Sequence, residues 1–258
     1  MAVLEVDGLS RAFGGVQALD QVSFAVDQAE LVALIGPNGA GKTTCFNCLG
    51  GQLHPDAGRV RLAGRDLVGL APREVWRLGV GRTFQITQTF GSMTVAENVQ
   101  QALISHHRRS RGLWRSARSL YRDQALWLLG RVGMADQAER ACAILAYGDL
   151  KRVELAIALA GDPKLLLMDE PTAGMAAGER VELMALVRSI VRERLLAALF
   201  TEHDMDVVFT HADRIMVLDR GRLVAAGDPR EVRADPLVQR VYLGTGDDLP
   251  AGAGAADA

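Results

Sequence analysis

The sequence has few cysteines, few aromatic residues and no long apolar segment. Phe, Trp and Tyr make up 5% of its 258 residues, and no stretch approaches the roughly 20 apolar residues of a membrane-spanning helix. The first residues lack the basic and apolar regions of a secretory signal peptide. Cys45, Cys48 and Cys142 form an odd set without the paired spacing of a zinc site, and we interpret them as small buried apolar residues. We expect a globular protein that stays in the cytoplasm.

The sequence also lacks a large excess of positive or negative charge. Lys and Arg total 29 and Asp and Glu total 31, so the formal net charge is −2. Because no overall field draws such a protein to nucleic acid or to anionic lipid, we expect no nucleic-acid partner. Hydrophobic residues make up 49% of the chain, which is ample for a packed core. The length allows one large domain or two small ones.

A glycine-rich loop carries the strongest signal in the chain. It follows the apolar run 31–35 and precedes a helix start at Thr44, and it consists of Gly36, Pro37, Asn38, Gly39, Ala40, Gly41, Lys42 and Thr43. This fits G-x-x-x-x-G-K-[ST] in the strand, loop and helix context of a phosphate-binding loop. Glycines let backbone N–H groups wrap a polyphosphate, Lys42 would neutralise phosphate charge, and the Thr43 hydroxyl suits Mg²⁺. The alternative is an ordinary glycine-rich turn.

The order of apolar patterns predicts the fold. Residues 3–26 alternate apolar and polar, which is typical of half-exposed antiparallel strands. Thr94 to Glu97 form a capping box that opens a helical insert, over about residues 87–160. The second half alternates apolar strands with helices, as in a parallel sheet covered by helices. We predict an α/β fold over residues 1–243, with a phosphate-loop NTPase core, a mostly parallel sheet, an N-terminal antiparallel β subdomain and a helical insert subdomain. The composition of the tail 244–258 predicts a disordered segment.

Two carboxylates end an apolar run in the second half. Residues 165–168 precede Asp169 and Glu170, so a strand brings both acids to the carboxyl edge of the sheet, beside the phosphate loop. Asp169 suits Mg²⁺, directly or through water. Glu170 suits general-base activation of a water molecule aimed at the γ-phosphorus. A purely structural pair of acids is the alternative.

With these motifs the chain resembles the ATP-binding cassette family over nearly its whole length. The resemblance rests on six motifs in the family's order: Phe13, the phosphate loop, Gln85 after Arg82-Thr83-Phe84, the segment Leu145-Ala146-Tyr147-Gly148-Asp149, the pair Asp169-Glu170, and Thr201-Glu202-His203-Asp204 after a strand. The segment 145–149 stands in the place of the family signature, often LSGGQ. Gly148 is retained there, whereas Ala146 replaces serine and Asp149 replaces glutamine.

The resemblance implies ATP and Mg²⁺ as ligands and two copies packed head to tail. Each ATP would lie between one copy's phosphate loop and the other's signature segment, formed by Ala146, Tyr147, Gly148 and Asp149. Phe13 would stack on the adenine, although the residue by itself slightly favours a core or turn aromatic. Gln85 would touch Mg²⁺ or water. His203 would contact the γ-phosphate and the attacking water, although an isolated histidine after a strand is otherwise a structural turn residue.

Within the family the likeness is closest to ATPase subunits of bacterial branched-chain amino acid importers, on segments 82–85, 168–175 and 241–244. This implies an ATP-hydrolysing subunit at the cytoplasmic face of the inner membrane. Its partners would be membrane permease subunits, a second ATPase subunit and, indirectly, a periplasmic binding protein. Subunits serving urea, amides or lipopolysaccharide export share much of the pattern. The motifs would also suit a cassette protein acting on ribosomes or DNA, or a nucleotide-binding scaffold without turnover.

Five arginines of the helical insert repeat with steps of three and four. They are Arg108, Arg111, Arg115, Arg118 and Arg122, and on one helix they share a face. The local sequence supplies no matching carboxylates at i±4, so a partner or anionic headgroups would have to compensate the repulsion. A solvated helix face is the alternative.

Changing Arg111, Arg115 and Arg118 to glutamine tests this stripe. We expect the ATPase rate of the isolated protein to stay intact and its association with anionic vesicles or with its permease to weaken, because each arginine contributes about 1 kcal/mol of salt-screened attraction. Co-sedimentation at several ionic strengths measures the effect. Unchanged association together with unchanged stability would make the stripe a solvated face.

Overall fold

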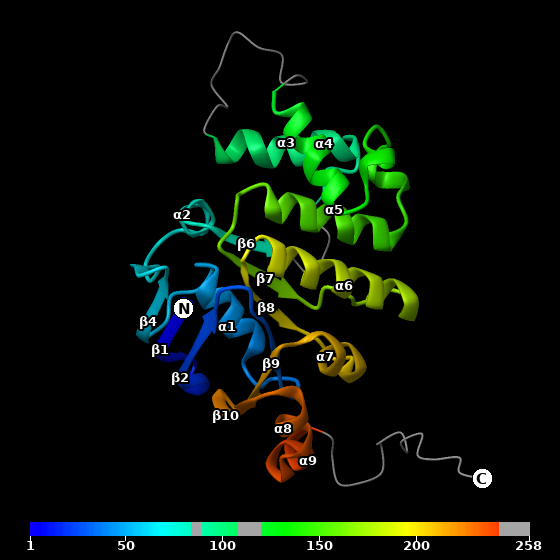
Figure 1. Cartoon of the computed structure of the whole chain (residues 1–258). Helices are drawn as coiled ribbons and strands as arrows, with labels where there is room; N and C mark the ends of the chain where they lie inside the picture. Colours follow the sequence, from blue (N-terminus) through cyan, green and yellow to red (C-terminus); the bar gives the residue numbers. More distant parts are fainter. Residues whose placement is uncertain (84–88, 108–119, 243–258) are drawn as a thin grey trace, which may run out of the picture.

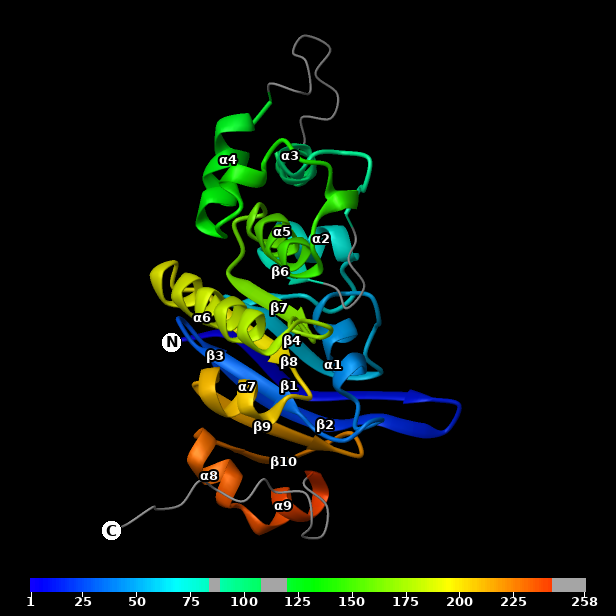
Figure 2. The ribbon, with the colours of Figure 1, turned by 90° about the vertical axis from the view of Figure 1, so that its right-hand side faces the viewer.

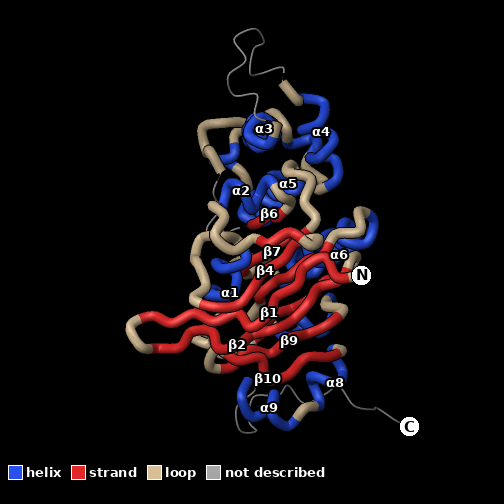
Figure 3. The backbone as a smooth tube through the Cα atoms, turned by 90° about the vertical axis from the view of Figure 1, so that its left-hand side faces the viewer, coloured by secondary structure: helices blue, strands red, loops and turns tan. Residues whose placement is uncertain are grey.

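A computed structural model describes residues 1–83, 89–107 and 120–242. Its described strands form two sheets, of six and four strands, with helices around them (Figure 1). A lobe made only of helices lies beyond one edge of the larger sheet, as the tube in Figure 3 also shows. The fold is therefore α/β with an antiparallel sheet and a helical lobe, which confirms the predicted fold class.

The smaller sheet is antiparallel and begins the chain. Its strands run in the order β2, β1, β4, β5 and span Ala2–Phe13 (β1), Val16–Asp27 (β2), Ala57–Leu62 (β4) and Arg65–Asp66 (β5). The β1–β2 register runs from Ala2 opposite Asp27 to Phe13 opposite Val16. The turn of this hairpin projects well beyond the rest of the protein (Figure 2). The antiparallel strands predicted within residues 3–26 are confirmed.

The larger sheet has the order β10, β9, β3, β8, β7, β6, and all neighbouring strands are parallel except β10, which is antiparallel at one edge. The strands span Leu31–Ile35 (β3), Val80–Thr83 (β6), Leu165–Asp169 (β7), Ala197–Thr201 (β8), Arg214–Asp219 (β9) and Arg222–Gly227 (β10). β3, β7 and β8 are buried along their whole length, which explains why they do not alternate and are apolar up to the last residues of β7 and β8, Asp169 and Thr201.

Each face of the larger sheet is covered by its own hydrophobic core. Leu31, Ala33 and Ile35 of β3 belong to the core that contains helices α6 (Ala177–Glu193) and α7 (Met205–His211) and reaches into the helical lobe. Val32 and Leu34 point to the opposite face, because successive side chains of a strand alternate. There they meet helix α1 (Lys42–Leu49) and the smaller sheet.

Helix α1 is enclosed by the second core. Phe46 and Leu49 are fully buried and share a cluster with residues of both sheets. Cys45 and Cys48 lie in the same cluster, and burial raises the pKa of the Cys48 thiol to about 11. Together with Cys142, which is also buried, they confirm the prediction of small buried apolar residues.

The helical lobe contains α3 (Val95–His106), α4 (Arg122–Arg131) and α5 (Tyr147–Leu159), with the short 3-10 turns Ala135–Gln137 and Cys142–Ile144 between the last two. The predicted capping box is confirmed: the Glu97 N–H donates to the Thr94 hydroxyl at 3.1 Å, and the Thr94 N–H donates to the Glu97 carboxylate at 2.9 Å. The remaining helices are α2 (Pro72–Arg77), α8 (Pro229–Ala234) and α9 (Pro236–Tyr242).

Arg122 corrects one part of the predicted arginine stripe. α4 begins at Arg122, and the residue before it, Tyr121, has φ of 57°, in the left-handed region, so no continuous helix runs through this point. The Arg122 guanidinium also forms an ion pair with Glu139, an acid from outside its own helix. Arg122 therefore does not belong to an uncompensated helical face. The other four arginines lie outside the described residues.

Candidate functional site

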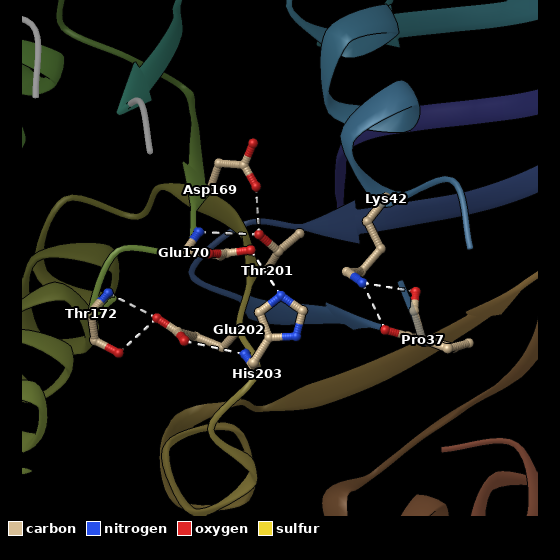
Figure 4. Close-up of polar contacts among 9 residues, drawn as sticks. Pro37, Lys42, Asp169, Glu170, Thr172, Thr201, Glu202 and His203 are labelled. Carbon is tan, nitrogen blue, oxygen red and sulfur yellow. Dashed lines mark hydrogen bonds and ion pairs between the residues drawn. The ribbon is translucent and has the colours of Figure 1, made fainter. Parts of the chain in front are cut away.

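Three parallel strands end side by side and carry the candidate site. β3 runs into the loop 36–41, β7 ends in Asp169 and Glu170, and β8 ends at Thr201 and leads to His203. Because β3, β8 and β7 are adjacent and parallel, their carboxyl ends lie at one edge of the sheet. Figure 4 shows Lys42, Asp169, Glu170 and His203 gathered at this edge.

Two glycines of the loop make room for the protein's own backbone. A Cβ on Gly36 would lie 2.1 Å from the Leu218 carbonyl oxygen, and a Cβ on Gly41 would lie 2.3 Å from the Ala18 carbonyl oxygen. Both residues also have positive φ. We expected glycine mainly because a polyphosphate approaches the loop, and that reason fits Gly39, where a Cβ would meet nothing within 4 Å and φ is 78°.

Lys42 is held against its own loop. Its ammonium group donates to the carbonyl oxygens of Gly36 at 2.6 Å and Pro37 at 3.2 Å, and the residue is 9% exposed. Burial lowers the pKa of Lys42, and the negative charges of Glu170 and Asp169 oppose this shift. The loop therefore presents a partly desolvated cation at the first turn of α1, where the helix dipole also favours an anion.

Asp169 is fixed by residues of two other strands. Thr201, its register partner on β8, donates its hydroxyl to Oδ1 at 2.7 Å. The Nη2 atom of Arg82, on β6, lies 3.7 Å from Asp169 Oδ2. The Arg82 guanidinium also donates to the Phe46 carbonyl in the last turn of α1. Burial lowers the pKa of Arg82, while the charge of Asp169 raises it. These contacts orient the Asp169 carboxylate, and its oxygens are the type of ligand that a hard cation prefers.

Glu170 and His203 face each other across the gap between the ends of β7 and β8. The His203 Nε2 atom lies 2.8 Å from Glu170 Oε1. Glu170 has φ of 48°, which is unusual for a residue with a long side chain, and its N–H is held by both the carbonyl and the hydroxyl of Thr201, each at 3.1 Å. Strained backbone of this kind concentrates at functional sites. A carboxylate paired with an imidazole is a competent acid–base couple.

The remaining predicted residues lie elsewhere or outside the described chain. Phe13 sits at the tip of the β1–β2 hairpin, 43% exposed, with the Arg11 guanidinium 4.9 Å from its ring centre. Gln85 lies outside the described residues. Thr43 is exposed and Thr44 half-buried on the first turn of α1. No group of three or more His, Cys, Asp or Glu side chains suited to a metal ion occurs among the described residues.

The signature segment is not part of the same cluster. Ala146 is the N-cap of α5, and Tyr147, Gly148 and Asp149 form its first turn. α5 packs against α3, α4 and β6, whereas α1 packs against β2 and β7. A Cβ on Gly148 would lie 3.2 Å from a Glu179 carboxylate oxygen, so Gly148 lies against the first turn of α6. Tyr147 is 42% exposed.

Sequence reasoning missed the residues that hold the acids in place. Thr201 and Arg82 appeared only as flanking letters of motifs, yet both contact Asp169. Thr201 could have been identified from its position at the end of a strand, because neighbouring parallel strands end at the same edge of a sheet. Fold and site together define a protein of the phosphate-loop class, with a lysine, two acids and a histidine gathered at one edge of the sheet.

Comparisons with known proteins give the family. The family model described as "ABC transporter" matches residues 19–173, more than half of the chain. LivG of Salmonella typhimurium, a high-affinity branched-chain amino acid transport ATP-binding protein, is 41% identical over 251 residues, which cover 94% of this chain and 98% of that protein. CysA of Bordetella bronchiseptica, a sulfate/thiosulfate import ATP-binding protein, is 39% identical over 244 residues, which cover 95% of this chain and 67% of that protein.

Solved structures agree with this relationship. The ADP conformation of MJ1267, an ATP-binding cassette of an ABC transporter, has a TM-score of 0.85 and 30% identity and covers 95% of this chain and 99% of that one. The cassette MJ0796, in a dimeric structure bound to ADP and Pi, has a TM-score of 0.74 and 25% identity, with 88% and 99% covered. A second family model, "Branched-chain amino acid ATP-binding cassette transporter", matches residues 222–248.

The chain belongs to the ABC transporter family and is one of its ATP-binding cassette ATPases. No helix within the described ranges is both long and apolar enough to cross a membrane.

Lys42→Ala tests the phosphate loop. We expect hydrolysis to be lost and ATP binding to weaken by at least about tenfold, because a charge-assisted contact is worth roughly 1.5 to 3 kcal/mol. Phosphate release and nucleotide titration measure both effects. Lys164→Ala is the matched control, since Lys164 is exposed and precedes β7 at the opposite edge of the sheet. Near-normal turnover of Lys42→Ala at saturating ATP would contradict the assignment.

Proposed function

We propose that this protein is the ATP-hydrolysing subunit of a bacterial importer of branched-chain amino acids. Sequence identity alone does not decide the cargo, because LivG and the sulfate protein CysA are almost equally identical to the chain. Two further observations favour branched-chain amino acids. The chain spans nearly all of LivG but two thirds of CysA, and a family model for branched-chain amino acid cassettes matches its C-terminal part, residues 222–248.

The pairing of Glu170 with His203 beside Lys42 carries the catalytic proposal. In this proposal the loop 36–41 and Lys42 bind the β- and γ-phosphates, and the Lys42 ammonium exchanges its loop carbonyls for phosphate oxygens. Glu170 takes a proton from a water molecule whose oxygen attacks the γ-phosphorus. ADP leaves as the bond to the γ-phosphorus breaks. His203 holds Glu170 and the attacking water in place.

The residues beside the loop also fit Mg²⁺. The Thr43 hydroxyl and the Asp169 carboxylate are hard oxygen donors, the type that Mg²⁺ prefers together with phosphate oxygens. Thr201 orients Asp169 for this task through the hydroxyl bonded to Oδ1. When bound, the metal would neutralise charge on the phosphates. Gln85 completes the proposed set of metal ligands.

The signature segment gives a reason for two copies. It opens α5 in the helical lobe, in different surroundings from the loop at α1. A second cassette packed head to tail would bring its own Ala146, Tyr147, Gly148 and Asp149 to the γ-phosphate, with backbone N–H groups at a helix start as donors. Because ADP lacks that phosphate, closure would depend on ATP. The dimeric relative MJ0796 supports such pairing.

The proposed partners follow from this cycle. Closure and reopening of two cassettes would drive separate membrane permease subunits at the cytoplasmic face of the inner membrane. A periplasmic binding protein would deliver the cargo to the permease without touching this chain. Phe13, at the exposed hairpin tip, is proposed to stack on the adenine.

Glu170→Gln tests the catalytic proposal. The amide keeps the shape of the side chain and removes the base, so we expect ATP binding to persist, hydrolysis to fall by at least about 100-fold, and an ATP-dependent dimer to accumulate in light scattering. Glu139→Gln, an exposed acid of the helical lobe, is the control and should retain the wild-type rate. If Glu170→Gln turns over ATP at the wild-type rate, Glu170 is not the base.

The cargo is tested by transport in proteoliposomes. The protein is combined with its permease and binding-protein partners, and uptake of labelled leucine, urea and sulfate is compared. We expect ATP-dependent uptake of leucine alone, and its loss when Glu170→Gln replaces the wild-type protein. Uptake of urea or sulfate in place of leucine would refute the cargo assignment while leaving the ATPase assignment intact.

A further inference from the structure

A buried polar bridge joins the two loops that follow β7 and β8. Glu202 is 3% exposed and Thr172 is 2% exposed. Glu202 Oε1 accepts hydrogen bonds from the Thr172 N–H at 2.8 Å and from the Thr172 hydroxyl at 2.7 Å, while Oε2 accepts from the His203 N–H at 3.3 Å (Figure 4). The Glu202 carboxylate in the loop after β8 therefore accepts hydrogen bonds from both the backbone and the side chain of Thr172 in the loop after β7.

Each of these loops carries one member of the proposed water-activating pair. Glu170 lies two residues before Thr172, and His203 directly follows Glu202. The side chains of the pair are 20% and 49% exposed respectively. Partly solvated pairs of this kind contribute little to holding two segments together. The buried bridge, which is shielded from water, is the stronger constraint on the separation of the two loops.

The chemistry of the bridge is more specific than packing requires. An apolar pair of similar volume would fill the same space without placing an acid between two strand ends. Burial raises the pKa of Glu202, and the charge of Glu170 raises it further, whereas the hydrogen bonds from Thr172 and His203 lower it. All three surrounding groups donate, so the arrangement suits a carboxylate and penalises the loss of any donor.

We infer that Thr172 and Glu202 are positioning residues that fix Glu170 and His203 at the separation needed to activate water. The inference rests on the proposed roles of Glu170 and His203. It predicts that damage to the bridge slows the chemical step more than it weakens nucleotide binding, because the phosphate loop is attached to different elements, β3 and α1. A residue that only packs the core would not produce that selectivity.

Thr172→Val and Thr172→Ser form the matched test. Valine has the shape of threonine without the donor, and serine keeps the donor. We expect Thr172→Val to lower kcat by about tenfold or more with KM changed by less than about twofold, since small misplacements of reacting groups have effects of this size. Thr172→Ser should restore most of kcat. Thermal unfolding with and without ATP shows whether each variant folds. If Thr172→Val does not fold, Glu202→Gln replaces it, because its amide places a donor against a donor.

A double-mutant cycle with His203→Ala decides whether the bridge acts through the pair. Single-turnover rates keep slow variants measurable. We expect Thr172→Val to have little further effect in the His203→Ala background. An unchanged kcat in Thr172→Val, an equal loss in both backgrounds, or a loss that serine does not rescue would overturn the inference. Wild-type hydrolysis and its loss in Glu170→Gln test the proposed function separately, so an active wild type with a fully active Thr172→Val refutes only the positioning role.

Discussion

Parallel pairing of β3, β8 and β7 is the constraint on which the rest of the structure depends. It brings three chain segments that are distant along the sequence to one edge of a sheet. Lys42 follows β3, His203 follows β8 and Glu170 follows β7. Both faces of the sheet are covered by hydrophobic cores, so packing holds the strand ends in place. The exposed side-chain pairs at the edge contribute little to holding them.

The groups at that edge are held by contacts within the protein. Lys42 lies against two loop carbonyls, Asp169 is held by Thr201, and Glu170 is paired with His203. The hydrogen bonds from Thr201 and His203 orient both acids at the strand ends, and preorganisation of this kind reduces the reorganisation needed during a reaction. The helical lobe shares a hydrophobic core with α6, and two ion pairs also join them, Arg131 with Glu193 and Arg152 with Glu182.

The local motifs were predictable because each lies within a short continuous segment of the sequence. The loop 36–43, the acids at 169 and 170 and the capping box at Thr94 all have fixed spacing and a clear physical reason. Contacts that depend on strand register were not predictable, and the hydrogen bonds from Thr201 to Asp169 and from Thr172 to Glu202 are of this kind. The start of α4 directly after the left-handed residue Tyr121 was not predicted, because the arginine periodicity continues across this point and a single left-handed residue is decided by tertiary packing.

A crystal structure of Glu170→Gln with ATP and Mg²⁺ tests the central claim most directly. The account predicts that the β- and γ-phosphates lie in the loop 36–41 and that the Lys42 ammonium has left the carbonyls of Gly36 and Pro37 for phosphate oxygens. It also predicts a water molecule between residue 170 and the γ-phosphorus, with His203 in contact. ATP bound away from this strand edge, or a γ-phosphate pointing away from residues 170 and 203, would contradict it.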